Sequence, residues 1–592
     1  FKVIKTEHFD VHFYPQEEKA ALDAARLAER AYGRLSRVLQ HEFRERKPII
    51  LYASHADFQQ TNALQEMIDE GTGGVTEALK NRVIVPFTGS YADFEHVLTH
   101  ELVHAFQFDV IFRRGVAAEV SPFAARLPLW FMEGMAEYLS IGHIDAHTAS
   151  WLRDAVMAGY FRTISEMNQR DDYLSYRFGQ SLMAYIGSKW GDEVIGVLLQ
   201  KAPRMGLERA FQSTLGVSLN ELGAAWAAEV RRTYLPEVTE RTRPTSIAAK
   251  LTKHEKLEDP WFLAPAASPD GRYIALLSNH EGFFFDLWLA DAKTGEMKKR
   301  LIKSSRDGDY ESLRYMNSSA SFSPDGRLLA FTAQSGGRDA LYIVDVERSR
   351  VVKQLKFQLN GMANPSWAPD GQRIVFTGLD GGISDLFVTD LEGNLTRLTD
   401  DRYADLLPAW SPDGRWIAFT TDRHEGTHFG DLRVGNLRVA LYDVERGTIE
   451  VLPHQERGKN VNPVWSPDGR SLVWISDRTG VNDLYLYDLE RRDLSRITEL
   501  LSGAIAITPL SPALSWGRDG RLLFVYFANA GYNIYALDDP RSLQRVAVQD
   551  LPPEPAATPL AGREPITITQ VDVPLDTVRV KGTTVSFYRT GD

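Results

Sequence analysis

A short turn motif that recurs through the second half of the chain is the feature that most constrains the fold. Ser-Pro-Asp-Gly begins at residues 268, 323, 411 and 466, and the variants Ala-Pro-Asp-Gly and Gly-Arg-Asp-Gly begin at 368 and 517. Proline presets φ, aspartate bonds back to the backbone and glycine accepts positive φ, so each full copy predicts a tight turn. Each turn precedes an apolar segment, such as residues 274–276 or 417–419, which predicts a buried strand.

The spacing of these turns predicts a β-propeller. The six copies lie 43 to 55 residues apart, and a period of about 45 residues with several strands is the length of one four-stranded blade. Six blades are therefore expected within residues 241–555. Leu251-Thr252 precedes the first copy much as Leu398-Thr399 precedes the fourth. We expect this early segment to supply an outer strand that closes the ring against the last blade.

The repeats resemble the TolB-like, WD40-like propeller repeats of bacterial envelope proteins over about 300 residues, including partner strands at 385–388 and 483–488. The resemblance implies a periplasmic or cell-envelope location and a protein partner that binds the propeller. We expect any signal peptide to have been removed before Phe1. In related architectures an outer-membrane barrel can follow the propeller, so residues 556–592 are expected to lead toward a further domain.

Residues 1–240 have a different pattern, which predicts an α+β domain. Alternating or apolar segments predict strands at residues 9–14, 48–52 and 82–86. Helical periodicity predicts helices at residues 17–39, from 92 onward, and at 129–139, 180–189, 191–200 and 219–234.

His100-Glu101-Leu102-Val103-His104 concentrates the predicted chemistry. On a helix, histidines at i and i+4 project from one face and can bind one metal ion, while the intervening glutamate reaches a water on that ion. Zinc lowers the pKa of its bound water toward 7, and Glu101 would take the proton as that water attacks a peptide carbonyl. The chain has no cysteine, so any zinc must be held by His, Asp or Glu.

Trp130-Phe131-Met132-Glu133-Gly134-Met135-Ala136-Glu137-Tyr138 resembles the second motif of the gluzincin peptidases, the HExxH…E zincins of the MA type. The resemblance covers roughly residues 5–200 and implies that Glu133 is the third zinc ligand. Glu137 would orient a ligand histidine, and the reverse assignment of the two glutamates stays open.

Two further roles follow from the same resemblance. Residues 73–77 lie where gluzincins place the edge strand that pairs with the substrate backbone. Gluzincins often stabilise the oxyanion with a Tyr or His of a later helix, which Tyr176, or alternatively Tyr173, would supply here. The fuller edge motif of the aminopeptidase branch is missing, which favours an endopeptidase.

Other features exclude alternatives. The net charge of −12 argues against a nucleic-acid partner, and no apolar run is long enough for a membrane helix. His143 and His147 are also spaced i, i+4, but they follow Gly142 in a predicted loop without a further ligand, so a second metal site is not expected. A serine peptidase of the prolyl-oligopeptidase type would need a Gly-x-Ser-x-Gly motif, which does not occur.

The sequence therefore predicts a zinc endopeptidase with one Zn²⁺ per chain, acting on peptide or protein substrates. Its propeller would bind a partner or restrict access to the cleft. The alternative is a non-catalytic envelope scaffold that acts through the propeller.

Overall fold

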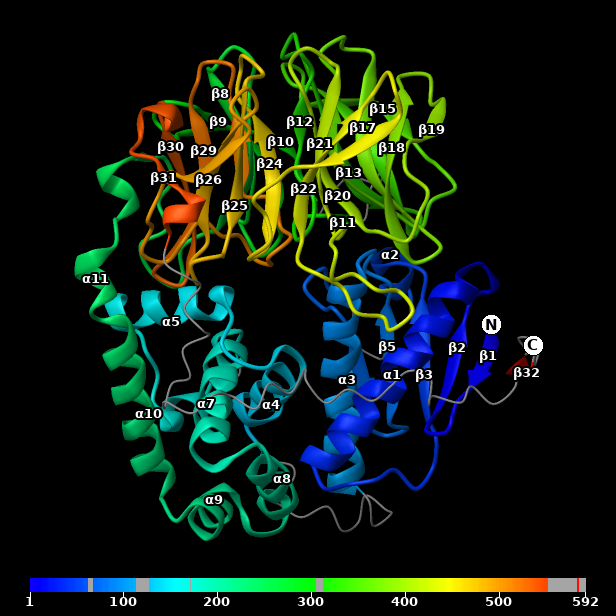
Figure 1. Ribbon diagram of the computed structural model, residues 1–592, viewed down its shortest axis with the longest axis vertical. Helices are drawn as coiled ribbons and strands as arrows, with labels where there is room; N and C mark the ends of the chain where they lie inside the picture. The colour runs from blue at the N-terminus through cyan, green and yellow to red at the C-terminus, as the bar shows by residue number, and fades with distance from the viewer. Residues whose placement is uncertain (62–67, 113–126, 171, 305–311, 552–582, 585–592) are drawn as a thin grey trace.

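A computed structural model of the chain describes residues 1–61, 68–112, 127–170, 172–304, 312–551 and 583–584. A six-bladed propeller built from the second half of the chain lies above a region of helices and one mixed sheet, which come almost entirely from the first half (Figure 1).

The recurring turns form as predicted. Ser268 Oγ donates a hydrogen bond to Asp270 Oδ1 (2.6 Å), the same oxygen accepts from the backbone N–H of Arg272 (3.0 Å), and Gly271 has φ of +68°. A Cβ atom added at Gly326 would lie 3.6 Å from Pro269, and Gly371, Gly414 and Gly469 repeat this contact with the proline of the preceding turn. Consecutive turns therefore pack against one another around one end of the propeller.

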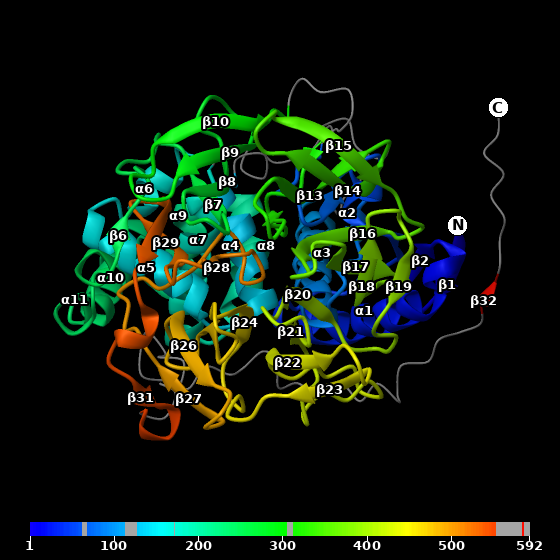
Figure 2. The same cartoon turned by 90° about the horizontal axis from the view of Figure 1, so that it is seen from above.

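Six sheets form the blades, and they follow one another around a ring when seen from above (Figure 2). The first three blades consist of β7 (Phe262–Ala267), β8 (Tyr273–Ser278), β9 (Asp286–Asp291) and β10 (Met297–Ile302); β11 (Ser312–Leu313), β12 (Ser321–Phe322), β13 (Leu328–Ser335), β14 (Arg338–Asp345) and β15 (Arg350–Leu355); and β16 (Gly361–Trp367), β17 (Arg373–Asp380), β18 (Ile383–Asp390) and β19 (Leu395–Arg397). The last three consist of β20 (Asp405–Trp410), β21 (Trp416–Thr421), β22 (Arg438–Asp443) and β23 (Thr448–Val451); β24 (Asn460–Trp465), β25 (Ser471–Ser476), β26 (Asp483–Asp488), β27 (Asp493–Arg496) and β31 (Val546–Ala547); and β28 (Leu514–Trp516), β29 (Leu522–Ala528), β30 (Gly531–Leu537) and β6 (Ala249–Lys250).

The ring closes between strands from opposite ends of the propeller sequence. β6 pairs antiparallel with β30, and the backbone N–H of Leu251 donates to Ile534 O (2.9 Å). The next residue, Thr252, accepts a hydrogen bond from Ile534 N through its hydroxyl (2.9 Å). Leu398 and Thr399 make the same two contacts with Leu386 of the third blade. The predicted closure by the Leu-Thr segment is therefore confirmed.

Five strands of the first half and β32 from the C-terminal end form a mixed sheet in the order β32-β1-β2-β3-β5-β4, in which β2, β3 and β5 are parallel and β4 is an antiparallel edge strand. Its strands are β1 (Lys2–Lys5), β2 (Phe9–Phe13), β3 (Lys47–Tyr52), β4 (Val75–Glu77), β5 (Arg82–Pro86) and β32 (Thr583–Thr584). Apart from β32, the predicted extension at 556–592 lies outside the described residues.

Helices of the first half pack on this sheet and on one another. They are α1 (Glu18–Val38), α2 (His55–Phe58), α3 (Tyr91–Phe112), α4 (Leu129–Ile141), α5 (Ala146–Ala158), α6 (Ile164–Met167), α7 (Leu174–Trp190), α8 (Glu193–Met205), α9 (Leu207–Leu215), α10 (Leu219–Tyr234) and α11 (Glu237–Glu240). Helix α7 begins six residues before the predicted start at 180, so Tyr176 lies on a helix. No helix within the described ranges combines the length and apolarity needed to cross a membrane.

The propeller contacts the first half on both sides of helix α3. On one side Ser384 N donates to Gly89 O (3.1 Å), and Arg402 forms an ion pair with Asp23 of α1 (2.5 Å). On the other side Asp154 of α5 accepts hydrogen bonds from the backbone of blade 6, and Trp151 stacks on Phe527 with ring centroids 4.3 Å apart. The propeller thus rests on both the sheet-bearing part and the helical part below it (Figure 1).

Candidate metal centre

Three side chains from two helices converge on one point. His100 Nε2 and His104 Nε2, one turn apart on α3, lie 3.2 Å from each other. Glu133 Oε2 of α4 lies 3.1 Å from the first nitrogen and 3.2 Å from the second. Two imidazole nitrogens and one carboxylate oxygen are the donor set of a catalytic zinc site.

A close crossing of helices α4 and α7 fixes where Glu133 and Tyr176 lie. A Cβ atom added at Gly134 would meet the carbonyl carbon of Gly179 at 2.4 Å, so the two backbones touch at this point. Only glycine at both positions permits this approach. The residues that flank the crossing, Glu133 on α4 and Tyr176 on α7, are thereby brought to the same side of α3.

Polar contacts on the outer ring nitrogens orient both histidines. His104 Nδ1 lies 2.8 Å from Gln107 Oε1, while the amide nitrogen of Gln107 donates to Met132 O (2.9 Å). The amide oxygen therefore accepts from His104 Nδ1–H, which leaves the lone pair of Nε2 facing inward. His100 Nδ1 likewise faces Glu137 Oε1 at 3.3 Å. Two inward ring nitrogens and a carboxylate oxygen at about 3 Å from them offer a cation three ligand atoms.

The electrostatics also favour positive charge at this point. Burial alone would lower the pKa of His100, but the carboxylates of Glu133 and Glu137 outweigh it and hold that pKa well above its usual range. Burial alone would also lower the pKa of His104, but the carboxylate of Glu133 outweighs it, so this pKa is raised as well. Burial would raise the pKa of Glu133, yet the two histidines hold it far below its usual range.

Glu137 occupies a supporting position rather than a place among the converging atoms. Its carboxylate lies between His100 Nδ1 and the guanidinium of Arg177, whose Nη1 is 3.3 Å from Glu137 Oε2. Arg177 Nη1 also lies 3.3 Å from Thr148 Oγ1, which donates to Gln180 Oε1 (2.6 Å). This geometry favours Glu133 over Glu137 as the ligand, and it reveals Arg177 as a residue that sequence reasoning missed.

Glu101 lies beside the converging atoms and next to the edge strand. Thr76 Oγ1 of β4 is 2.8 Å from Glu101 Oε2, and a Cβ atom at Gly74 would meet Glu101 Cγ at 2.8 Å. Burial raises the pKa of Glu101. Among the described strands, β4 pairs only with β5, so its other edge offers backbone groups within reach of Glu101. The predicted edge strand at 73–77 therefore adjoins the site.

Tyr176 faces the histidines and Tyr173 does not. The ring of Tyr176 is nearly parallel to that of His100, with 9° between planes and 6.5 Å between centroids. Burial, followed by the nearby carboxylates of Glu133 and Glu101, raises the pKa of Tyr176 far above its usual range. Tyr173 is 40% exposed and stacks on the outer side of Tyr176. The geometry thus favours Tyr176 of the two candidates.

His143 and His147 do not both lie in a loop, which corrects the prediction. Asp145 caps α5 by accepting from Thr148 N (2.8 Å), so His147 lies in the first turn of a helix. His147 is 2% exposed, and burial, reinforced by the positive charge of Arg177, lowers its pKa to about 3.

A second group of acidic side chains converges in the propeller, at Asp385, Asp401 and Asp405. Arginines already neutralise it. Arg423 forms ion pairs with both Asp401 and Asp405, and Arg397 Nη2 lies 2.5 Å from Asp385 Oδ2. This group is therefore better described as an ion-pair network than as a metal centre.

Comparison with known proteins defines the propeller. A family model described as TolB beta propeller domain (PD40) matches residues 258–394, which begin just before β7 of blade 1 and end just before β19 of blade 3. Together with the six-blade topology, this match shows that the C-terminal part is a TolB-like six-bladed propeller, as the repeats predicted. The comparison with curated proteins found no match.

Solved structures with similarity to the chain include a putative TolB from Agrobacterium tumefaciens, at 20% identity over 49% of this chain and 96% of that chain, with a TM-score of 0.34. TolB from Acinetobacter baumannii is 18% identical over 57% of this chain and 69% of that chain, with a TM-score of 0.32. An oligogalacturonate lyase in complex with manganese is 14% identical over 50% of this chain and 94% of that chain, with a TM-score of 0.34.

Proposed function

We propose that the protein is a zinc-dependent endopeptidase with one zinc ion per chain, held by His100, His104 and Glu133. The observation that carries the proposal is the convergence of these three donors while both outer ring nitrogens face hydrogen-bond acceptors. Zinc in such a site lowers the pKa of a water molecule toward about 7 and polarises a carbonyl group.

Glu101 is the proposed general base. Its carboxylate takes a proton from the attacking water and returns it to the nitrogen of the leaving amine. Burial raises its pKa, which makes it a better proton acceptor than an exposed glutamate. Thr76 holds the carboxylate toward the site by its contact of 2.8 Å. Tyr176, kept protonated by burial and neighbouring carboxylates, donates a hydrogen bond to the developing oxyanion.

The open edge of β4 supports a peptide substrate bound as an added strand. Backbone hydrogen bonds to such an edge provide affinity without strong sequence preference, which suits an endopeptidase. The propeller lies directly above helix α3 and touches both parts that flank it, so access from that side is restricted (Figure 1). We therefore assign the propeller an access-limiting or partner-binding role.

The TolB-like propeller supports a setting in the bacterial periplasm or cell envelope and a protein partner there. The same propeller also supports the second candidate function, a non-catalytic scaffold. What disfavours the scaffold is the side-chain arrangement around Glu101, because a protein without catalysis has no chemical need for a buried base beside a metal site.

Elemental analysis of the purified protein, combined with casein cleavage by the wild type and Glu101→Gln, tests the proposal. We expect one zinc per chain in both proteins and a loss of activity of about 10²- to 10⁴-fold in the variant. Glu95→Gln is the matched control, since Glu95 lies on the same helix and pairs with Arg30 away from the site. A folded chain that binds no zinc would overturn the assignment. Zinc without cleavage of any protein substrate would favour the scaffold.

A further inference from the structure

The segment that leads into the edge strand is held by the propeller rather than by its own domain alone. Residues 68–74 lead directly into β4, and Glu70 and Gly71 of this segment lie beside Arg314 and Tyr315 of blade 2. Glu70 in this segment and Arg314, just after β11, have side chains only 5% and 6% exposed. They form an ion pair although 244 residues separate them in sequence.

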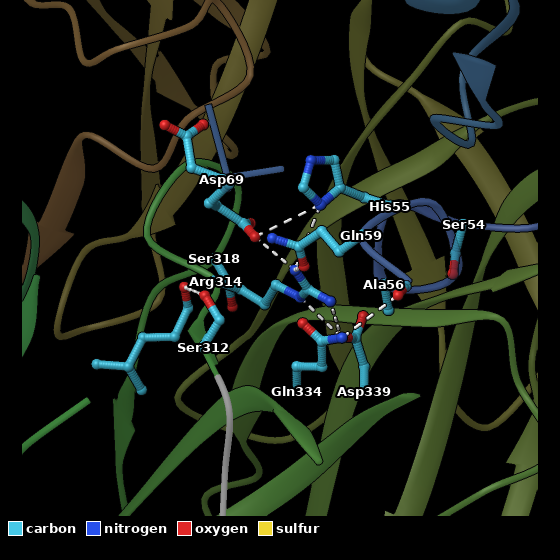
Figure 3. A network of polar contacts seen from close by, with 12 residues as sticks. Ser54, His55, Ala56, Gln59, Asp69, Ser312, Arg314, Ser318, Gln334 and Asp339 are labelled. Carbon is cyan, nitrogen blue, oxygen red and sulfur yellow. Dashed lines mark hydrogen bonds and ion pairs between the residues drawn. The ribbon is translucent and has the colours of Figure 1, made fainter. Parts of the chain in front are cut away.

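Arg314 joins three acceptors from both parts of the protein (Figure 3). Its Nη1 atom pairs with Glu70 and donates to Gln59 Oε1 (3.1 Å) at the end of α2. Its Nε and Nη2 atoms lie 2.7 and 2.6 Å from Asp339 Oδ1 on β14. Asp339 in turn accepts from Met362 N (3.1 Å), so the arginine is anchored in the propeller.

Further contacts hold the same segment in place. His55 Nε2 donates to Thr72 O (3.0 Å), and Asp69 Oδ1 accepts from Gly71 N (2.8 Å) and Thr72 Oγ1 (3.0 Å). On the propeller side, Gln334 donates to Ala56 O of α2 (3.3 Å). Figure 3 shows the α2 residues and the blade 2 residues facing one another around Arg314.

A displacement of residues 68–74 would reach the candidate active site, because the next residues of the chain contact Glu101. Gly74 packs against Glu101 with no space for a side chain, and Thr76 contacts the Glu101 carboxylate. Removing Arg314 would leave the buried carboxylates of Glu70 and Asp339 without their shared cation, which strongly disfavours the present position of the segment.

We infer that Arg314 is a positioning residue for peptide cleavage: through Glu70 it holds the edge strand β4 and the Thr76–Glu101 contact in the geometry that binds and cleaves substrate. This inference rests on the proposed peptidase function. The propeller would then do more than limit access to the site: its contact with residues 68–74 would also be needed for the catalytic geometry.

Arg314→Gln tests the inference, with Arg402→Gln as matched control. Arg402 also forms an ion pair with a buried carboxylate across the two parts, but its partner Asp23 lies on α1 and does not contact β4. We expect Arg314→Gln to bind zinc as the wild type does and to lose about 10- to 100-fold in kcat/KM on fluorescently labelled casein. Arg402→Gln should stay within about twofold. Arg314→Lys keeps the charge without the planar fork and should restore part of the activity.

Hydrogen exchange distinguishes failure of this inference from failure of the proposed function. Exchange at residues 68–77 should rise in Arg314→Gln and in Glu70→Gln, with exchange in α3 unchanged. Exchange at residues 68–77 in the double variant Arg314→Gln/Glu70→Gln should be no faster than in Arg314→Gln, because the unpaired buried charge of Glu70 is then removed. Equal exchange of β4 in Arg314→Gln and Arg402→Gln would overturn the inference.

If the wild type cleaves nothing, the proposed function fails, while the exchange data still show whether Arg314 holds the strand. If Arg314→Gln does not fold, Glu70→Gln and Arg314→Lys provide the same comparison.

Discussion

Gln107 fixes the ring of His104 through its amide oxygen, which lies 2.8 Å from the outer nitrogen of that ring. The hydrogen bond from the amide nitrogen to Met132 O (2.9 Å) fixes the orientation of the amide, so the atom that faces the ring is the oxygen, which can only accept. Gln107 is one turn beyond His104 on the same face of α3, so the sequence carries a signal for this role that motif matching overlooks.

Gln107→Leu should weaken zinc binding while leaving the three ligands intact. Loss of the acceptor frees the imidazole to rotate and to change tautomer, and such supporting contacts typically contribute about 10- to 100-fold in metal affinity. Competition with a chromophoric chelator would measure the change. Gln200→Leu is the control, because Gln200 donates to Leu39 O and Gln40 O away from the site. Equal affinities for the two variants would contradict the role of Gln107.

Gly134→Ala should disturb the site through the helix crossing. The new methyl group would lie 2.4 Å from the backbone of Gly179, so α4 and α7 must separate. We expect a loss of about 1–3 kcal/mol in the free energy of unfolding and weaker zinc binding, because Glu133 moves with α4. Urea denaturation and zinc titration would measure both effects.

Gly223→Ala serves as control for the crossing. Its Cβ atom would lie 3.3 Å from the side chain of Ile164, which can adjust where a backbone cannot. Equal free energies of unfolding and equal zinc affinities for Gly134→Ala and Gly223→Ala would show that the α4–α7 contact does not set the position of Glu133.

Local sequence signals predicted the propeller and the proximity of His100 to His104, because each depends on short-range geometry. The recurring turn contains its own hydrogen bonds, and the Leu-Thr pairs reveal equivalent outer strands. His100 and His104 are adjacent by helical periodicity. The convergence of Glu133 with them required a resemblance to a known motif, since no local rule places α4 beside α3.

Features that depend on contacts distant in sequence could not be predicted. The start of α5 had a local signal, since Asp145 accepts a hydrogen bond from Thr148 N, but the burial of α5 against the propeller had none. Arg177 acquires its role only because Glu137 of another helix lies beside it. The pairing of Arg314 with Glu70 depends on how the two halves dock, which no spacing within either half indicates.

Glu17 should make the stability of the protein fall as pH rises. Burial is the largest cause that raises its pKa from 4.5 to about 7, and the nearby carboxylates of Asp57 and Asp380 add to it. The folded state therefore holds the proton more tightly than the unfolded state. Its stabilising contribution is complete below about pH 4.5 and is lost as pH rises through 7. The upper limit of this loss is about 3 kcal/mol.

Glu17→Gln, which stays neutral at every pH, tests this expectation. The variant should have a higher thermal midpoint than the wild type at pH 8, and the difference should shrink toward pH 4. Glu18→Gln is the control, since Glu18 forms an exposed pair with Lys2 that contributes little. Parallel pH profiles for wild type and Glu17→Gln would show that Glu17 is not protonated preferentially in the folded state.

Thr252→Val should weaken closure of the propeller more than the equivalent change within a continuous blade. The Thr252 hydroxyl accepts from Ile534 N at 2.9 Å, and its removal leaves a buried N–H without a partner, at a cost of about 1–3 kcal/mol. Thr399→Val removes the same contact to Leu386 N (2.9 Å) in blade 3 and provides the comparison.

The two strands joined at Thr252 come from opposite ends of the propeller sequence, so their separation opens the ring. We therefore expect a lower urea midpoint and faster proteolysis within residues 249–254 for Thr252→Val than for Thr399→Val. Identical midpoints and cleavage patterns would mean that closure depends on blade packing rather than on this strand.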